Sequence, residues 1–568
     1  MSMRKVRRKT VIGLMIGLLG LSCSTMGWTA PPPIPSSADS GLELRRQQEE
    51  RARARLAQEL EAGPAAGSGA IEGAATAPPE ETMPPLRFTL RTVTVDPSAV
   101  LPAGAGAEAA APYIGQEVTV ADLYAIVEKI NARYQAGGYL TCRAYLPPQT
   151  IHEGAVHIAL FEGRVGEVRV RGNDHTRDVY IKRRMDIEPG TIPRYQDMDK
   201  AIRWFNTTND VQLQLALKAG EAPGTTDFEL TAQEPKNGTF TFYVDNAGGE
   251  TTGRWREGLY YTNRSLLGWR DRLTLGLLHT RGVRSFNVGY SIPVGQRGGR
   301  LSFDYSTNTT EVVAGQYRDW GIPVLGHADA LQASFTQPLW VTPAMKAEAS
   351  LTLSRQHSVT DMTEARIPMI DDTFTQGEAA LAFTHYGKGS AFYHRHAFTC
   401  GHWQNASLTR LAKPSANYNF YAFQGIYQRG AAHGQLFTTR ANVQISANKD
   451  MRPSKQFFLG GVYSIRGYEE NAIGAANGFS CTMEYAVPVL KKPDLRLYGF
   501  LDYGRLWGEG IPDHHVLASV GLGLRANFSS WGSMDLSVGV PLYRTIGYSS
   551  MPTTVSTPRV HLLMTAQF

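Results

Sequence analysis

The sequence predicts a membrane β-barrel that follows an N-terminal helix and two small α+β domains. Two observations predict the barrel. Apolar residues alternate with small or polar ones in segment after segment from about residue 237 to the final residue, Phe568. No amphipathic helix or long apolar run separates these segments. A closed barrel in lipid requires strands of about ten residues that are apolar outside and polar inside, because every backbone donor must pair within the protein.

The alternation is regular enough to assign faces to individual strands. One segment places Phe286, Val288, Tyr290 and Ile292 on the same face, and the last segment does so with Val560, Leu562, Met564, Ala566 and Phe568. The opposite faces carry Gly, Ser, Thr, Asn and isolated charges, which suit a hydrated lumen better than a packed core. A soluble sandwich would show the same pattern over one or two strands, so the long repetition favours the membrane barrel.

The first thirty residues are predicted to be an export signal. Arg4, Lys5, Arg7, Arg8 and Lys9 precede the apolar run 11–21, which is too short for a membrane-spanning helix. Removing these five charges lowers the formal net charge from +6 to about +1, so no basic surface argues for nucleic acid. Cys142, Cys400 and Cys481 lie beyond the signal without a CxxC motif or a disulfide framework, and we interpret them as ordinary thiols.

Residues 31–63 contain a predicted helix over 41–62, rich in Glu, Gln and Arg. Its apolar face is thin, with Leu42, Leu56 and Leu60, and a helix that is polar nearly all round does not dock on an apolar core. Two interpretations remain open from the residues alone: a solvated spacer, or a plug in a polar barrel lumen of about 30 Å height. Residues 64–86 are rich in Ala, Gly and Pro and are predicted to form a flexible linker.

Residues 87–163 and 164–235 are predicted to be two α+β domains. In the first, Thr119 and Asp122 start a helix whose apolar face continues to Tyr134, between strands on either side. The second repeats this plan. Neither contains a phosphate loop, a metal-spaced His/Cys set or a nucleophile elbow, so we expect binding rather than catalysis and no cofactor or metal. Short open sheets leave edge strands that can pair with an extended peptide.

Four motifs resemble the two-partner secretion transporters of the outer membrane, a family typified by ShlB, FhaC and HecB. Ile465-Arg466-Gly467-Tyr468 is similar to the family's loop motif, and Phe500-Leu501-Asp502-Tyr503-Gly504 to its FxDxG strand motif. Asp245-Asn246-Ala247-Gly248 and the segment 263–268 resemble the start of the family's barrel. The four occur in the family's order and on the expected architecture.

The resemblance implies a barrel of about sixteen antiparallel strands over residues 236–568, with POTRA domains at 87–163 and 164–235 in the periplasm. It favours the plug interpretation of residues 31–63. It implies a monomeric transporter, not an enzyme, that recognises a large adhesin-like or haemolysin-like exoprotein through that partner's N-terminal secretion domain. It also implies contact with outer-membrane lipid, insertion by the barrel-assembly machinery and Phe568 as the C-terminal signal of the barrel. No nucleic acid partner is expected.

The alternation of the strand 495–504 adds an argument that does not depend on the family. It sends Phe500 and Asp502 into the lumen, where a carboxylate needs a partner. Arg466, on a glycine-bracketed loop, can supply a bidentate contact to it. We therefore expect Arg466, Gly467, Tyr468, Phe500, Asp502 and Gly504 to form a functional site in the lumen. The alternative is that Arg466 and Asp502 are solvated charges without mutual contact.

Two other functions compete with secretion. A barrel-assembly factor of the same superfamily carries more POTRA domains than the two predicted here, and a passive porin leaves those domains and the plug unexplained. His394, His396, Cys400 and His402 lie close together in the sequence, but we interpret them as a polar segment on the extracellular side or facing the lumen, not as a metal site.

Overall fold

The computed structural model describes residues 36–61, 87–362, 367–406, 415–448, 451–490, 494–528, 531–555 and 557–568. The predicted signal 1–30 and linker 64–86 lie outside the described residues. Within the described part of the chain, no helix combines the length and the apolar character that a membrane crossing demands.

Sixteen of the described strands close into one antiparallel barrel, in which β28 pairs with β9. Each strand pairs in antiparallel fashion with the next barrel strand along the chain, although the connections between strands vary widely in length. The strands are β9 (Gly238–Asp245), β10 (Arg256–Asn263), β11 (Arg272–His279), β12 (Val283–Val294), β13 (Gly299–Glu311), β14 (Val324–Val341), β15 (Met345–Met362), β16 (Ile367–Gly387), β17 (Ser390–Asn405), β18 (Ser415–Gly430), β19 (Leu436–Ile445), β22 (Asn477–Leu490), β23 (Asp494–Trp507), β24 (Val516–Asn527), β25 (Gly532–Pro541) and β28 (Arg559–Gln567).

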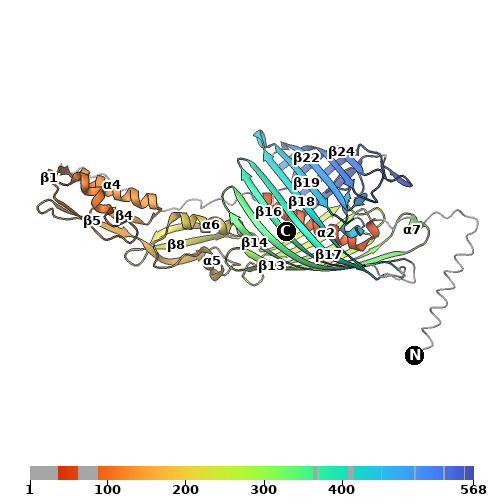
Figure 1. Ribbon diagram of the computed structural model, residues 1–568, viewed down its shortest axis with the longest axis horizontal. Helices are drawn as coiled ribbons and strands as arrows, with labels where there is room; N and C mark the ends of the chain where they lie inside the picture. The colour runs from red at the N-terminus through yellow and green to blue at the C-terminus, as the bar shows by residue number, and fades with distance from the viewer. Residues whose placement is uncertain are drawn as a thin grey trace, which may run out of the picture. The chain divides into compact units, whose positions relative to one another are not determined.

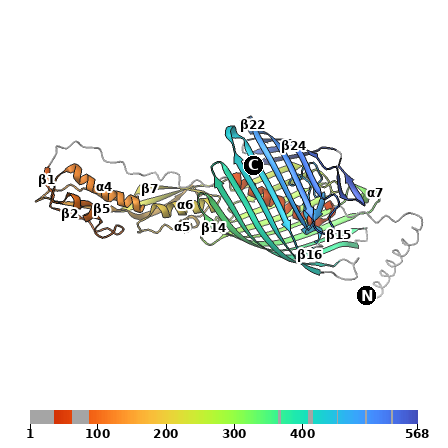
Figure 2. The same cartoon turned by 45° about the horizontal axis from the view of Figure 1, so that its top comes forward.

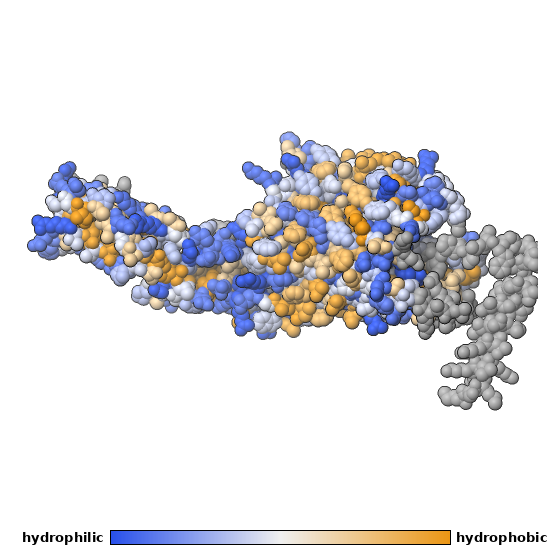
Figure 3. Space-filling view, viewed as in Figure 1, coloured by the Kyte–Doolittle hydropathy of each residue, from blue (hydrophilic) through white to orange (hydrophobic). Residues whose placement is uncertain are grey.

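The two faces of the barrel wall differ as the alternation predicts. Leu351, Leu353 and Leu501 are exposed on the outside, whereas Thr360 and Asp502 are fully buried inside. Figure 3 shows hydrophobic residues gathered over the outer surface of the barrel strands. An apolar exterior around a polar interior fits a cylinder embedded in lipid.

The first α+β domain packs the helix α4 (Val120–Gly137) on short strands. These are β1 (Arg87–Thr89), β2 (Thr92–Val95), β3 (Glu117–Thr119), β4 (Cys142–Tyr145) and β5 (Ala155–Glu162), with the short helices α3 (Ala105–Ala110) and η2 (Ala111–Tyr113). Thr119 and Asp122 form a reciprocal capping box at the start of α4. The predicted apolar face of α4, including Leu123, Ile130 and Tyr134, lies in the core.

The second α+β domain repeats the plan with β6 (Arg164–Arg171), α5 (Asp178–Met185), α6 (Tyr195–Thr208), β7 (Gln212–Ala219) and β8 (Thr225–Gln233). Its sheet has the order β6-β8-β7, and its core includes Tyr180, Phe205 and Phe228. The central strand of the first domain is β5, between β2 and β4. Both domains therefore have free edge strands, as the sequence predicts.

The helix α2 (Ser40–Glu61) lies inside the barrel, after the short helix η1 (Ser36–Ala38). Both views show it among the barrel strands (Figures 1 and 2). The helix is buried at its first turns although it is polar on nearly every side, because the lumen supplies polar partners. Ser285 donates to Gln47 (2.6 Å), and Arg51 donates to Ser306 (3.0 Å). The structure thus decides between the two interpretations of this segment in favour of the plug.

The predicted fold class is confirmed: a closed barrel of sixteen strands follows an N-terminal helix and two α+β domains. Smaller elements complete it. They are α7 (Gln316–Asp319), η3 (Ala432–Gly434), and the pair β26 (Thr545–Tyr548) and β27 (Met551–Thr554) between β25 and β28. The domain boundaries given above stay predictions.

Candidate functional site in the lumen

A long connection between β19 and β22 folds back into the barrel. This connection, residues 446–476, is called the lumenal loop, and it contains η4 (Pro453–Lys455), β20 (Phe457–Leu459) and β21 (Ile473–Ala475). Leu459, Ile465 and Tyr468 are fully buried in a cluster with Leu506 and Leu517 of the barrel. These residues of the loop are therefore packed on the inner wall of the barrel.

Arg466 connects the lumenal loop to β23. Its Nε and Nη2 donate to the two carboxylate oxygens of Asp502, at 2.8 and 2.7 Å, and its backbone N–H donates to the same carboxylate at 3.0 Å. The guanidinium carbon Cζ of Arg466 lies 3.4 Å from the ring centroid of Phe500. Asp502 is fully buried and Arg466 is 4% exposed. The structure thus brings together the two charges that the sequence analysis paired, rather than leaving them separately solvated.

A second carboxylate takes part that sequence reasoning missed. Arg466 Nη1 donates to Glu484 Oε1 on β22 at 2.7 Å, so the guanidinium is held by two strands. Arg440 and Arg525 approach the same carboxylate at 3.4 and 3.7 Å. Glu484 is the only carboxylate in the lumen-facing alternation of β22, and that isolated charge was the available signal.

Gly467 and Tyr468 fit the loop tip against the barrel wall. A Cβ built on Gly467, whose φ is +92°, would lie 3.0 Å from the carbonyl oxygen of Gly539 on β25. The Tyr468 hydroxyl lies 2.9 Å from the carbonyl oxygens of Ala518 and Tyr543 and accepts from the Tyr543 N–H at 3.1 Å. Gly504 leaves room for the loop in the same way, because a Cβ there would lie 2.5 Å from Leu459.

We expect Gly467→Ala to weaken the seating of the lumenal loop and to reduce secretion. The left-handed backbone and the close approach to β25 both disfavour a side chain, at a cost of about 1–3 kcal/mol. Gly510→Ala is the matched control, since Gly510 also has a positive φ (+66°) but open space around it. Limited proteolysis of the lumenal loop and export of the exoprotein measure the effect. Equal behaviour of the two variants would contradict the packing argument.

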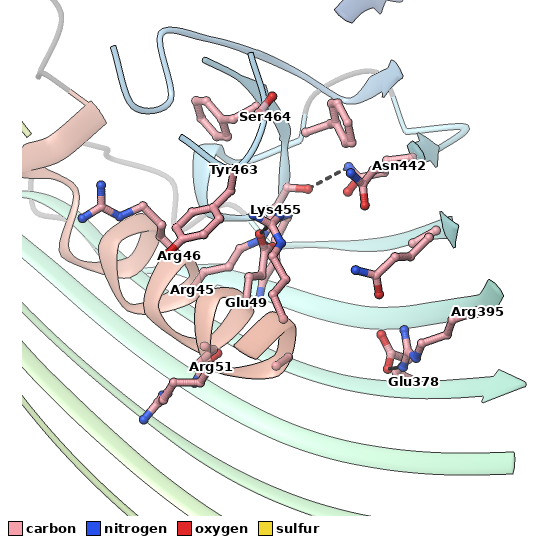
Figure 4. Close-up of a pocket in the computed structure, with 18 of the residues that line it drawn as sticks. Arg45, Arg46, Glu49, Arg51, Glu378, Arg395, Asn442, Lys455, Tyr463 and Ser464 are labelled. Atoms are coloured by element: carbon pink, nitrogen blue, oxygen red, sulfur yellow. Dashed lines mark hydrogen bonds and ion pairs between the residues drawn. The ribbon is translucent and has the colours of Figure 1, made fainter. Parts of the chain in front are cut away.

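The plug helix borders a cavity of about 580 Å³ inside the barrel. Figure 4 shows Arg45, Glu49, Lys455 and Tyr463 gathered between α2 and the lumenal loop, with Glu378 and Arg395 on the facing strands. Arg45 donates to the carbonyl oxygens of Ser454 (3.1 Å) and Gln456 (2.7 Å), so helix and loop are attached to each other. The barrel is thus filled by two polar segments and an aqueous space between them.

Arg256 on β10 attaches α2 to the barrel wall. Its Nε and Nη2 donate to Asp245 of β9 at 2.7 and 2.9 Å, and its Nη1 donates to Glu50 of α2 at 3.0 Å. Arg256 is 1% exposed. Arg46, one turn before Glu50 in the helix, donates to the carbonyl oxygen of Ala247 at 2.8 Å. These contacts involve the Asp245–Gly248 segment that the sequence analysis singled out without assigning a role to it.

The histidines of β17 lie elsewhere than expected. His394 and His396 alternate with Tyr393 and Arg395, which line the cavity, so the two imidazoles occupy the outer face near the exposed Phe392. The lumen-facing alternative is therefore wrong for these two residues, because the strand places the opposite parity inside, whereas the extracellular alternative stays a prediction. Their ring nitrogens are 3.0 Å apart and His385 lies 3.2 Å from His394. Cys142, Cys400 and Cys481 are free thiols.

The last residue closes the barrel seam. Backbone hydrogen bonds of 3.0 and 2.9 Å join Phe568 to Phe240 of β9, and the Phe568 side chain is exposed. The aromatic terminus therefore stands on the outer surface where the first and last strands meet.

Comparison with known proteins identifies similar chains. Residues 224–526, more than half of the sequence, match the model of the family described as haemolysin secretion/activation protein ShlB/FhaC/HecB. Residues 88–163 match the model described as POTRA domain, ShlB-type. The heme/hemopexin transporter protein HuxB of Haemophilus influenzae is 24% identical over 456 residues, covering 76% of this chain and 80% of that protein. The outer membrane transporter CdiB of Escherichia coli is 22% identical over 486 residues, covering 79% and 80%.

Solved structures show the same fold. CdiB from Escherichia coli aligns with a TM-score of 0.65 at 20% identity, covering 96% of this chain and all of the other. CdiB from Acinetobacter baumannii aligns with a TM-score of 0.64 at 16% identity, covering 95% and 100%. A BamA structure from Haemophilus ducreyi that lacks POTRA domains 1–3 aligns with a TM-score of 0.50 at 14% identity, covering 85% and 100%.

Proposed function

The chain belongs to the ShlB/FhaC/HecB family of haemolysin secretion/activation proteins, and from this premise we propose that it secretes a large partner exoprotein across a bacterial outer membrane. The two POTRA domains lie in the periplasm and the barrel spans the membrane. The observation that supports this best is a closed barrel whose polar lumen is occupied by a polar helix rather than by an apolar core. A lumen filled in this way is closed at rest, and it opens when the helix α2 moves aside.

Recognition of the exoprotein takes place on the POTRA domains. The free edges of the sheets β2-β5-β4 and β6-β8-β7 present unpaired backbone groups. An extended segment of the exoprotein can pair with these groups and add a new strand to the sheet. The N-terminal secretion domain of the exoprotein is the segment that docks there before the remainder enters the lumen. Backbone pairing of this kind tolerates many side chains and suits a partner that arrives unfolded.

The other interactions follow from the same architecture. The apolar exterior contacts outer-membrane lipid, and the exposed aromatic Phe568 at the barrel seam serves as the signal read by the barrel-assembly machinery. Arg466, Gly467, Tyr468, Phe500, Asp502 and Gly504 hold the lumenal loop on the inner wall during transport. No catalytic step is part of this function.

Deleting residues 87–163 is expected to reduce export of the exoprotein to background, because the partner then lacks one of its two docking sheets. The second POTRA domain keeps its own contact with the barrel, where Arg177 donates to the carbonyl oxygen of Gly268 at 3.0 Å. The measurement is the amount of exoprotein in the medium after co-expression of the transporter with its partner exoprotein. Heat-modifiable mobility of the barrel on gels controls for insertion. Export at the full-length level would refute the docking mechanism.

A further inference from the structure

The periplasmic end of the lumen contains a cluster of arginines around the turn between β10 and β11. This turn, residues 264–271, contacts the second POTRA domain, since Ser265 Oγ donates to the carbonyl oxygen of His175 at 2.6 Å. Arg272 is the first residue of β11, and its side chain faces the lumen. Successive side chains of a strand alternate between its two faces, and Leu277, on the other face, is exposed on the outside of the barrel. Arg300 of β13 also faces the lumen, because the exposed Phe303 lies on the other face of the same strand.

A single carboxylate of the POTRA domain faces three of these arginines. Arg270 Nε and Nη2 donate to both oxygens of Asp210, at 3.0 and 2.6 Å. Arg264 and Arg272 stay 3.7 and 3.6 Å from the same carboxylate, too far for hydrogen bonds. Burial alone would raise the pKa of Asp210, but the hydrogen bond and charge of Arg270 and the charges of Arg272 and Arg264 hold it below its ordinary value. Asp210 is therefore ionised, and each of its oxygens accepts a hydrogen bond from Arg270.

Asp271, another acidic residue near the cluster, accepts its hydrogen bonds from groups other than the arginines. Asp271 accepts hydrogen bonds from the N–H groups of Leu267 and Trp269 and from the Tyr290 hydroxyl. Arg300 donates to the carbonyl oxygen of Arg270 at 3.1 Å and to Ser291 Oγ at 2.8 Å. Asp210 is therefore the carboxylate that Arg264, Arg270 and Arg272 approach, and Arg300 donates to neutral oxygens.

Some donors of the cluster have no partner. Arg270 Nη1 and Arg264 Nε are buried without a hydrogen bond, and Arg270 is 1% exposed. The side chains of Arg264 and Arg272 are 23% and 32% exposed, so an anion can reach them. A buried donor without an acceptor is costly, and a carboxylate is the acceptor that a guanidinium binds best.

The positive surface continues from the cluster into the cavity. Arg51 and Arg55 of α2 line the cavity together with Asp304 of β13, whereas the other acidic residues of the lining, Glu49, Glu378 and Glu470, lie on other parts of it. Arg55 lies close enough to Arg272 for the two positive charges to repel each other. The wall formed by β10 to β13 and the C-terminal half of α2 is therefore more basic than acidic along the first part of the route from the periplasm.

We propose that Arg264 and Arg272, supported by Arg270 and Arg300, form a binding site for carboxylate side chains of the incoming exoprotein. This inference rests on the proposed secretion function and names the chemistry of the segment that enters first. An extended chain with aspartates or glutamates docks on the partly exposed guanidinium groups of Arg264 and Arg272 and then moves on, because two partly solvated contacts hold it only weakly. The excess positive charge also draws an acidic segment from the periplasm toward the pore, within about 10 Å at moderate ionic strength.

The test uses the full-length protein in detergent and a fluorescent oligoglutamate peptide, with an oligoglutamine peptide of equal length as the neutral comparison. Fluorescence anisotropy at low salt should show binding of oligoglutamate alone. The Arg264→Gln/Arg272→Gln double variant should bind it about tenfold or more weakly, because two charge-assisted contacts are lost. The matched control is Arg281→Gln/Arg318→Gln, which removes the same charge from exposed arginines outside the cluster.

Each outcome decides between alternatives. Unchanged affinity of the Arg264→Gln/Arg272→Gln variant, or an equal loss in the control, would overturn the site. Absence of oligoglutamate binding by a wild-type protein that secretes its exoprotein would overturn the inference and leave the proposed function standing. Binding by a protein that exports no exoprotein would refute the function and leave the site. Heat-modifiable mobility shows that both variants are folded.

Discussion

Replacing Arg466 with alanine is expected to abolish secretion while the barrel remains inserted in the outer membrane. The variant leaves Asp502 and Glu484 buried without their shared cation, and losing one partner of a buried ion pair costs about 3–5 kcal/mol. The lumenal loop then loses its attachment to β22 and β23. Secreted exoprotein in the medium, measured beside the amount of heat-modifiable barrel in the membrane, gives the result.

The control for this prediction lies on the same strand. Arg496 of β23 pairs with Asp494 at 3.1 Å, but both side chains are about one-third exposed, so Arg496→Ala removes a solvated pair of small value. Secretion by Arg496→Ala should match the wild type. Normal export by Arg466→Ala would show that the loop contact is dispensable for transport.

Replacing Arg256 with alanine is expected to open the resting pore. Arg256 joins Glu50 of the plug helix to Asp245 of the wall, and without it Asp245 loses its cation and Glu50 keeps only Arg46, at 3.8 Å. Losing this contact weakens the closed position of the plug by about 3–5 kcal/mol, which shifts the population toward the open state. Conductance in planar bilayers, and sensitivity of cells to large antibiotics that the outer membrane excludes, should both rise.

Arg254→Ala is the matched control for the pore. Arg254 lies two residues from Arg256 but pairs with Glu250 on an exposed surface. Its loss should leave conductance at the wild-type level. Wild-type conductance of Arg256→Ala would show that the contacts of Arg45 and Arg46 hold the plug without it.

The barrel was predictable because the alternation of a strand has period two and lipid allows only one parity outside. Leu497, Leu501 and Tyr503 are exposed, and Phe500 and Asp502 are buried, as that alternation requires. The helix α4 was equally clear, since its capping box and apolar face are both local signals. Such features are encoded over ten to twenty residues and need no knowledge of partners.

What could not be predicted depends on register and on contacts distant in sequence. Glu484 is opposite Phe500 in the pairing of β22 with β23, and one sequence does not fix that register. The position of α2 could not be decided because a helix that is polar all round suits solvent and a polar lumen equally. Arg270 and Asp210 lie on different domains, so nothing near either residue announced their pairing.

The lumenal loop also bears on how the molecule is made. Through Glu484, Asp502, the carbonyl of Ala518 and Gly539, it touches four consecutive strands from inside. A segment of this size, wedged behind a wall, enters far more easily while the cylinder is still an open ribbon. We therefore expect biogenesis to run in a fixed sequence, in which the loop is laid on the nascent C-terminal strands before the seam at Phe568 is sealed.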